Sequence, residues 1–249
     1  MSVPYHAAIV VAHPDDETLW CGGTLIRLKD AGAVITIICL TNANDDVRQG
    51  EFQTACGRLG AIPVIFDLPD GGMQVLPDFA ARLDAALFQR PDIVITHPNH
   101  GNERGHFQHR QCWAVVSGWA RAKGIPLAVF LEVSFGRLPG ESSRRLSGSL
   151  HRTELFSALR GFFQDLRNIV SYLRHGSRAA LAHDSRPSWR GAVQLAIGID
   201  LARKRDLLAV YSSQLDGMRQ YEMYGRPTEY IRFFDRRSAM TFEQMLLRG

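Results

Sequence analysis

The sequence AAIVVAHPDDE at residues 7–17 joins a continuous apolar run to a group of polar residues of types that can bind metals. The run from Ala7 to Ala12 is typical of a strand buried on both faces of a parallel sheet. Pro14 disfavours a helical conformation for His13, so the strand is expected to end in a tight loop. That loop places an imidazole and carboxylates at the carboxyl end of a strand. Imidazole nitrogen with carboxylate oxygen suits Zn²⁺, and also iron or manganese.

Beyond this stretch, strands and helices alternate along the chain. Further buried strands are predicted at Val34–Leu40, Val64–Leu68, Ile93–Thr96 and Leu127–Val133. Helices are predicted at Cys21–Lys29, Gln49–Leu59, Phe79–Gln89, Phe107–Lys123 and Ile199–Tyr211. This alternation is typical of an α/β fold with a mainly parallel sheet. We expect a Rossmann-like sheet in the order 3-2-1-4-5, flanked by helices, within a single domain that spans residues 1–249.

Residues 141–192 are predicted to form a basic helical insertion or lid after strand five. Apolar residues recur at three- and four-residue steps from Leu155 to Leu173, which indicates an amphipathic helix. Residues 144–190 hold nine Arg against three acidic residues, a charge of +6, so the rest carries −2 of the net +4. Three interpretations stay open: a packing helix with solvated Arg side chains, contact with an anionic substrate, or docking on an anionic membrane surface. No nucleic-acid-binding motif accompanies this charge, so no nucleic-acid partner is expected.

The composition, with 45% hydrophobic and 22% charged residues, is ordinary for a globular protein. The four cysteines show no Cys-x-x-Cys spacing, which predicts buried free thiols in a reducing compartment. The N-terminal residues do not read as a secretory signal, and no apolar run is long enough to span a bilayer. A cytoplasmic location is therefore expected, with a peripheral position at the membrane as an open alternative.

A second polar segment follows the strand Ile93–Thr96 and contains two His-x-x-His pairs. His97 and His100 lie in an irregular stretch, whereas His106 and His109 open the next predicted helix. Residues three apart in a first helical turn share one face, which favours His109 over His100 as a metal ligand. In a 3-2-1-4-5 sheet the first and fourth strands are neighbours, and the crevice opens at their carboxyl ends. Both polar segments are therefore expected to meet in one pocket.

These motifs resemble the signature of the PIG-L/LmbE family of zinc-dependent N-deacetylases. The resemblance is carried by AHPDDETL at residues 12–19 with GGT at 22–24, and by GHFQH at 105–109. Weaker similarity is found in Arg48-x-x-Glu51-x-x-x-Ala55, in Leu68-Pro69-Asp70-Gly71 and in the segment from Lys204 to Gln214. It extends well over about residues 5–133 and poorly over about 200–215.

The resemblance implies a metal centre and a proton carrier. The metal ligands would be His13, Asp16 and His109, and the cofactor would be Zn²⁺, with Fe²⁺ as an alternative. Asp15 would be the general base. The chemistry agrees, because zinc with three protein ligands keeps a position open and activates water near neutral pH. Asp15 adjoins a ligand without needing to be one, so it can move the proton.

Other matching positions imply contacts with the substrate. His106 would face the carbonyl oxygen as a second catalytic residue, and Arg48 and Asp70 would bind substrate hydroxyls. Two positions depart from the family pattern. Gln108 stands where Asp is usual beside the last ligand, so it would orient a histidine more weakly, and Tyr211 stands where His is common. These departures affect the expected substrate more than the expected metal site.

The predicted function is removal of an N-acetyl or other acyl group from an N-acetylglucosamine-type sugar in a larger conjugate. The sugar is implied by the family resemblance alone. An alternative within enzymes is an amidase of a non-sugar acyl-amine, such as a thiol conjugate or a lipopeptide. A different class is a non-catalytic nucleotide-binding module. That class is disfavoured, because acidic residues replace the Gly-rich phosphate loop after the first strand.

Overall fold

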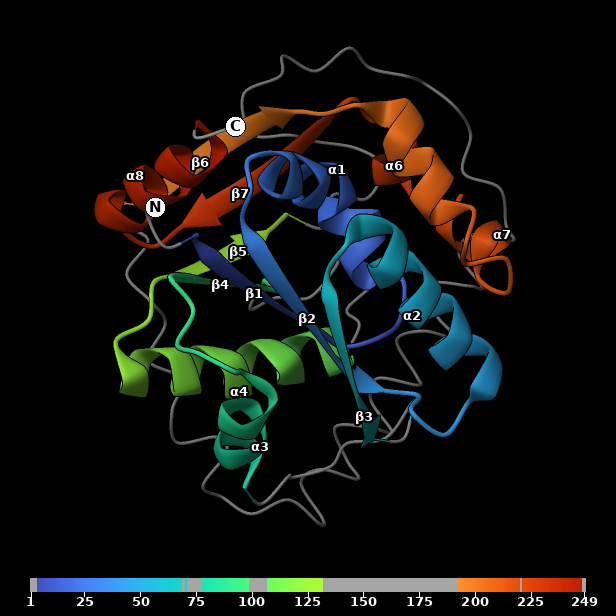
Figure 1. Ribbon diagram of the computed structural model, residues 1–249, viewed down its shortest axis with the longest axis horizontal. Helices are drawn as coiled ribbons and strands as arrows, with labels where there is room; N and C mark the ends of the chain where they lie inside the picture. Colours follow the sequence, from blue (N-terminus) through green and yellow to red (C-terminus); the bar gives the residue numbers. More distant parts are fainter. Residues whose placement is uncertain are drawn as a thin grey trace, which may run out of the picture.

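The computed structural model describes residues 4–68, 70, 78–98, 107–131, 192–219 and 221–247. Within these residues one sheet runs through the molecule, and helices cover both of its faces (Figure 1). Its strand order is β3-β2-β1-β4-β5-β7-β6. The predicted α/β class and the predicted order 3-2-1-4-5 are therefore confirmed.

Five parallel strands form the predicted part of the sheet. They are β1 (His6–Val11), β2 (Val34–Thr41), β3 (Ile62–Leu68), β4 (Ile93–Thr96) and β5 (Leu127–Phe130). Two further strands, β6 (Val193–Gly198) and β7 (Thr228–Phe233), were not predicted. They pair with each other antiparallel, and β7 joins β5 antiparallel. The C-terminal part of the chain thus completes the sheet on the side of β5.

Helices cover the two faces of the sheet unequally. One face packs against α1 (Asp16–Asp30), α2 (Asp46–Leu59), α6 (Leu201–Leu208), α7 (Leu215–Met218), the short 3₁₀ turn η2 (Glu222–Tyr224) and α8 (Arg236–Leu246). The other face packs against α3 (Phe79–Ala86) and α4 (Phe107–Lys123). In Figure 1, α3 and α4 lie together on one side of the strands, and α1, α2 and α6 lie on the other.

Strand β1 is the centre of both hydrophobic cores. Ala7, Ile9 and Val11 point into the core shared with α1 and α2, and Ala8 and Val10 point into the core shared with α3 and α4. Every residue of the strand is buried. This explains why its sequence is apolar without alternation. It also fixes the carboxyl end of β1 beside that of β4, since Val10 pairs with Thr96.

Several helix boundaries differ from the prediction. Helix α1 begins at Asp16, so the polar motif itself forms the first turn. Helix α2 begins at Asp46 because the Asp45 carboxylate accepts the backbone N–H groups of Val47 and Arg48, as an N-cap does. Helix α3 ends at Ala86 and α6 ends at Leu208, and α8 was not predicted. The start of α1 has a functional consequence, because it places Asp16 at the positive end of a helix.

Helix α1 is broken near its middle. Cys21 has φ −142° and ψ 17°, outside the helical region. The N–H groups that this break exposes, those of Gly23 and Thr24, donate to the carboxylate of Glu229 on β7 at 3.0 and 2.7 Å. Lys204 of α6 neutralises that carboxylate at 2.8 Å and also donates to Leu19 O at 2.8 Å. Residues from the C-terminal part therefore cap both sides of the break.

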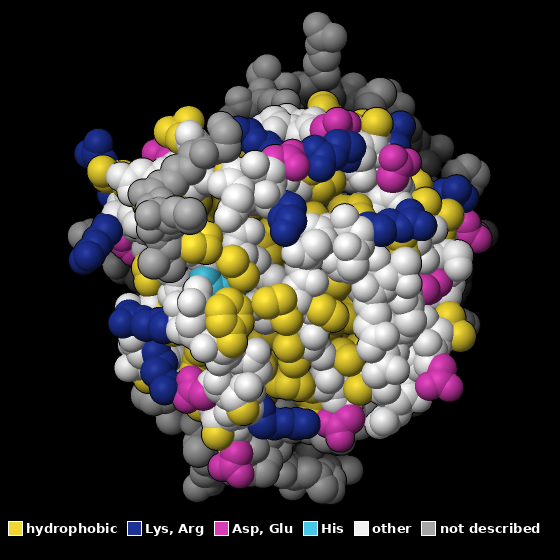
Figure 2. All heavy atoms as spheres, viewed as in Figure 1, with side chains coloured by type: hydrophobic (Ala, Val, Ile, Leu, Met, Phe, Trp, Pro, Cys, Tyr) yellow, Lys and Arg dark blue, Asp and Glu magenta, His cyan; other side chains and the backbone are white. Residues whose placement is uncertain are grey.

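Other predictions concern the surface and the remaining segments. All four cysteines are free and buried, as predicted. The predicted basic insertion at 141–192 lies outside the described residues, except for its last residue, as do His100 and His106. On the face drawn in Figure 2, side chains of both charges are interspersed around a hydrophobic middle among the described residues. No helix among the described residues is both long enough and apolar enough to cross a bilayer.

Candidate metal centre

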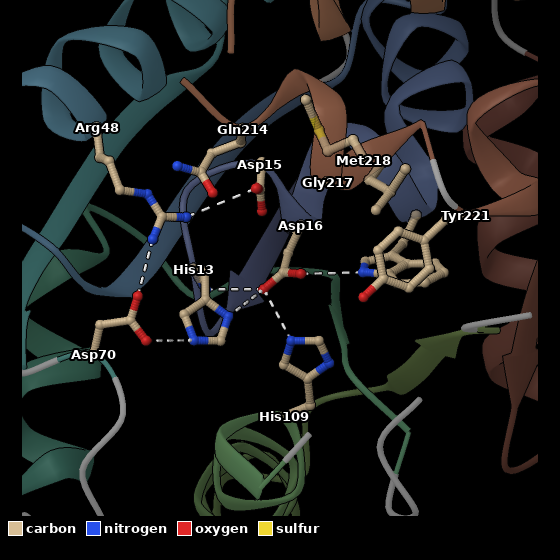
Figure 3. A pocket seen from close by; sticks show the side chains of 12 residues that line it. His13, Asp15, Asp16, Arg48, Asp70, His109, Gln214, Gly217, Met218 and Tyr221 are labelled. Atoms are coloured by element: carbon tan, nitrogen blue, oxygen red, sulfur yellow. Dashed lines mark hydrogen bonds and ion pairs between the residues drawn. The ribbon is translucent and has the colours of Figure 1, made fainter. Parts of the chain in front are cut away.

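Two segments that are far apart in the sequence meet at the carboxyl ends of β1 and β4. His13 follows β1, Asp16 opens α1, and His109 lies in the first turn of α4. All three side chains are buried, with 8%, 6% and 3% of their surface exposed. Figure 3 shows both imidazoles directed at the Asp16 carboxylate. The predicted convergence of the two polar segments is therefore present.

The three side chains offer their ligand atoms at one point. His13 Nδ1 lies 3.2 Å from Asp16 Oδ2, and His109 Nε2 lies 3.4 Å from the same oxygen. One ligand atom from each residue falls within 4.8 Å of the others. A tetrahedral zinc ion with bonds of about 2.0–2.1 Å needs ligand atoms about 3.3 Å apart. The donor set and its spacing therefore fit Zn²⁺.

The second nitrogen of His13 is held by two oxygens. Gln108 Oε1 lies 2.6 Å from His13 Nε2, and Asp70 Oδ1 lies 3.4 Å from it. Both oxygens are acceptors, so Nε2 carries a proton, and Nδ1 is the nitrogen that faces Asp16 and would turn its lone pair to a bound ion. Such contacts fix the orientation of a metal-binding histidine. Gln108 thus fills the orienting position, with Asp70 adding a carboxylate.

His97 lies in the irregular stretch after β4, as predicted, and is also part of this cluster. It is fully buried, and its ring stacks on that of His109 at 3.9 Å with an angle of 28°. The backbone N–H of Ala12 donates to His97 Nε2 at 2.9 Å. That bond uses the lone pair a metal would need. His97 therefore supports the ring of His109 and the end of β1.

Asp15 lies beside the metal ligands in a strained backbone conformation. Its φ is 111°, a region that residues with a side chain rarely adopt. Its N–H donates to Glu17 Oε2 at 3.2 Å, and its carboxylate lies 3.7 Å from Arg48 Nη2. The conformation turns the Asp15 carboxylate toward Arg48 (Figure 3). Asp15 therefore lines the pocket without joining the three ligand atoms.

The two adjacent carboxylates differ in acidity. Burial and the neighbouring Asp16 raise the pKa of Asp15 well above its usual value, against the opposing effect of Arg48 and His13. Burial also acts to raise the pKa of Asp16, but the electrostatic effect of the neighbouring histidines, His109 first, outweighs it and holds that pKa well below the usual value. A divalent cation would lower the pKa of Asp15 again. Asp16 is thus suited to bind a cation and Asp15 to accept a proton.

Arg48 and Asp70 form an ion pair on one side of the pocket. Arg48 Nη1 lies 2.9 Å from Asp70 Oδ2, and Nη2 donates to Pro14 O at 3.0 Å. Hydrogen bonding to His13 is the largest of the effects that hold the pKa of Asp70 at about 2. With 41% of its side chain exposed, Asp70 is accessible to a ligand. Both residues that were predicted to bind hydroxyls therefore lie at the pocket.

The opposite wall comes mostly from residues outside the sequence motifs. The pocket has a volume of about 260 Å³ and is lined by His13, Asp15, Asp16, Leu19, Trp20, Arg48, Asp70, His109, Gln214, Gly217, Met218 and Tyr221. The wall formed by Leu19, Trp20, Met218 and Tyr221 is largely apolar. Two of these residues come from the part of the chain after β6, and only the weak similarity of the Lys204–Gln214 segment pointed in that direction.

Tyr211 and Gln214 lie on opposite sides of the segment that follows α6. Tyr211 is fully buried, and its hydroxyl donates to Glu17 Oε1 at 2.5 Å. The neighbouring serines bind Glu51 of α2, with Ser213 Oγ 2.6 Å from Glu51 Oε2. These contacts hold the segment so that Gln214 enters the pocket. Tyr211 therefore holds Glu17 of the HPDDE motif by a hydrogen bond and does not line the pocket.

Comparisons with known proteins agree with this architecture. The model of the PIG-L family, described as GlcNAc-PI de-N-acetylase, matches residues 8–120. This part of the chain belongs to the PIG-L family. The PIG-L match spans β1 to α4 and so includes both histidine segments. The family assignment predicted from the motifs is therefore confirmed.

Individual PIG-L relatives are distant. A 1D-myo-inositol 2-acetamido-2-deoxy-alpha-D-glucopyranoside deacetylase of Rhodococcus erythropolis is 29% identical over 46% of this chain and 52% of its own length. The enzyme of the same name, numbered 1, from Saccharopolyspora erythraea is 26% identical over 52% of this chain and 58% of its own length. The chain thus spans only about half of the length of the curated relatives that it matches. A deacetylase of teicoplanin biosynthesis, 13% identical, aligns over 91% of this chain and 96% of its own with a TM-score of 0.55, which shows the fold alone.

Proposed function

We propose that the protein is a metal-dependent N-deacetylase that hydrolyses the acetamide of an N-acetylglucosamine-type sugar in a larger conjugate. One observation carries the proposal: a carboxylate outside the ligand set, Asp15, lies next to a buried His/Asp/His group with the spacing of a zinc site. Hydrolysis of an unactivated amide needs an electrophile, a nucleophilic water and a proton carrier. The pocket supplies a place for each of them.

The ligands would be His13, Asp16 and His109, and the ion would be Zn²⁺ or Fe²⁺. A bound divalent ion would polarise the amide carbonyl and supply an activated water. Gln108 and Asp70 accept from His13 Nε2, so Nδ1 would be the nitrogen that binds the ion. The apolar wall limits access of bulk water on the opposite side.

Asp15 would carry the proton. A carboxylate with a raised pKa accepts the proton of the attacking water readily and returns it to the departing amine. The charge of Arg48, 3.7 Å from Asp15, acts to lower that pKa and so favours the ionised form that acts as a base. His106 immediately precedes α4, three positions before His109, and we assign it to the carbonyl oxygen on the family resemblance.

The sugar assignment is supported by the relatives and by the polar side of the pocket. The curated relatives are deacetylases of an acetamido sugar linked to inositol. Asp70 and Arg48 present a carboxylate and guanidinium N–H groups, which suit neighbouring hydroxyls. We propose that, when the substrate binds, hydrogen bonds to its hydroxyls replace some of the contacts between Asp70 and Arg48.

A second candidate is an amidase of a non-sugar acyl-amine, such as a thiol conjugate or a lipopeptide. The apolar wall of Leu19, Trp20, Met218 and Tyr221 favours it, because this wall would also accommodate a hydrocarbon group. A nucleotide-binding module is disfavoured by the buried carboxylates where a phosphate would lie.

The test measures loss of the acyl group by mass spectrometry. The substrates are N-acetylated free sugars, nucleotide sugars, lipid-linked sugars and acylated thiol conjugates. The proposal expects zinc-dependent loss of the acetyl group, with release of acetate, from at least one acetamido sugar. Turnover of non-sugar amides alone would favour the second candidate. Absence of any turnover in the zinc-loaded protein would contradict both.

Asp15→Asn tests the proton carrier. The amide cannot accept a proton at neutral pH, so we expect kcat to fall by about 10²–10⁴-fold. Bound zinc, measured by mass spectrometry of the metal, should stay the same as in the unmodified protein. Asp46→Asn, on the exposed first turn of α2, is the matched control and should keep its activity. Full activity of Asp15→Asn with normal zinc would remove Asp15 from the mechanism.

A further inference from the structure

Trp20 makes a polar contact with the metal-binding carboxylate. Its indole Nε1–H donates to Asp16 Oδ1 at 3.1 Å. The two residues are four positions apart, so one turn of α1 places the indole over the carboxylate. The other carboxylate oxygen, Oδ2, is the one that faces His13 Nδ1 and His109 Nε2. The two oxygens of Asp16 are thus assigned to different partners.

We propose that Trp20 is a positioning residue that holds Asp16 so that only Oδ2 is presented to the metal ion. This inference rests on the proposed metal function of the site. An indole N–H is a donor only and can neither bind a cation nor accept a proton. By occupying Oδ1, it would oppose bidentate binding by the carboxylate. A monodentate Asp16 leaves more of the coordination sphere open, as catalytic zinc sites require.

The surroundings of Trp20 fix the direction of this hydrogen bond. The side chain is only 1% exposed, although its edge lines the pocket. Tyr221 packs against it edge to face, with ring centroids 5.2 Å apart and an angle of 73°. Trp20 is also the last residue before the break in α1 at Cys21. The indole is therefore held on one side by the helix and on the other by a ring from the C-terminal part.

The backbone N–H of His13 also restrains the Asp16 carboxylate. It donates to Asp16 Oδ2 at 2.9 Å. An ionised carboxylate oxygen accepts about two hydrogen bonds, so a single direction remains on Oδ2 for the ion. Loss of the Trp20 N–H would leave Oδ1 buried and without this donor. The carboxylate would then gain by turning Oδ1 toward the cation.

The experiment replaces Trp20 with Phe and, separately, with β-(3-benzothienyl)alanine, in which sulfur takes the place of the N–H without a change of ring shape. The full-length protein is loaded with Zn²⁺ or Co²⁺ alone. Zinc affinity is measured by chelator competition, and the visible absorption of Co²⁺ reports the coordination number. Trp119→Phe is the matched control. Trp119 Nε1 also donates to a carboxylate, that of Asp84 at 2.9 Å, but this pair is not part of the metal site.

Both Trp20 replacements should weaken zinc binding about 10–100-fold and reduce the Co²⁺ absorption several-fold, as the ion gains a fifth ligand. Trp119→Phe should change neither. If Trp20→Phe fails to fold, the benzothienyl variant decides the question. Affinity and spectrum equal to those of the unmodified protein in that variant would overturn the proposal. Failure of the unmodified protein to bind either ion would instead contradict the proposed metal function.

Discussion

The adjacent residues Asp15 and Asp16 illustrate how one dipeptide serves two purposes at the residue scale. Asp16 is the first residue of α1, where the helix dipole favours a carboxylate, and it faces the imidazoles. Asp15 has a φ of 111°, which costs about 1–3 kcal/mol for a residue with a side chain. The same backbone turn directs its carboxylate away from the ligand atoms. The local strain thus separates the proposed metal ligand from the proposed proton carrier.

The choice of histidine can be tested directly. We expect His109→Ala to lower zinc affinity by more than about 100-fold, because it removes a ligand. His97→Ala should lower it only about tenfold, because it removes a ring that supports the ligand. Equilibrium dialysis with metal analysis measures both.

His6→Ala is the control for this comparison, since His6 is buried in β1 but binds Thr36. Its zinc affinity should match that of the unmodified protein. A larger loss in His97→Ala than in His109→Ala would show that the ligand set is wrong.

At the scale of elements, the broken helix α1 depends on two others. Glu229 of β7 caps its second half, and Lys204 of α6 neutralises that carboxylate, with both side chains 0% exposed. Removing one partner of a buried ion pair leaves an uncompensated charge. Gly23 is needed at the contact, because a Cβ there would lie 2.5 Å from Ile199.

Lys204→Met should therefore destabilise the protein by about 3–5 kcal/mol, measured by urea unfolding. The double variant Lys204→Met/Glu229→Gln should recover part of the loss, because the buried charge is gone. Arg203→Met is the matched control, since Arg203 pairs with Asp30 at an exposed position. Its effect should stay below about 1 kcal/mol. This account would be refuted if the double variant lost more free energy of unfolding than the two single variants lose together.

The elements that could be predicted from the sequence are those whose pattern is regular. The five parallel strands are continuous apolar runs, and their expected order puts His13 and His109 at the ends of neighbouring strands. Strand β7 was missed because its buried face carries Glu229, which disrupts the apolar alternation with Ile231 and Phe233. Trp20 could have been linked to Asp16 by helical spacing. Tyr221 could not, because it lies about 200 residues away from Trp20 and no local pattern joins them.

At the scale of the whole molecule, the sheet separates two cores that enclose every cysteine. Cys21, Cys39 and Cys56 belong to one core and Cys112 to the other. Burial raises the pKa of the first three thiols, the largest effect at each, so their reactive thiolate form is scarce.

We therefore expect thiol reagents to modify fewer than about one cysteine per chain within minutes in the native protein. In guanidinium chloride all four should react. Absorbance after reaction with Ellman's reagent gives the count. Rapid modification of two or more thiols in the folded protein would contradict the packing of these cores.

The cap that Glu229 provides to α1 also constrains how the protein is made. Translation proceeds from the N-terminus, so Gly23 and Thr24 leave the ribosome about 200 residues before the side chain that accepts their N–H groups. Until residue 229 emerges, the second half of α1 lacks its cap and Lys204 lacks its counter-ion. The helix that carries Asp16 at its start therefore reaches its final form late in synthesis. Residues 8–120 hold the motifs of the family match but lack the two side chains that cap and neutralise the break in their first helix.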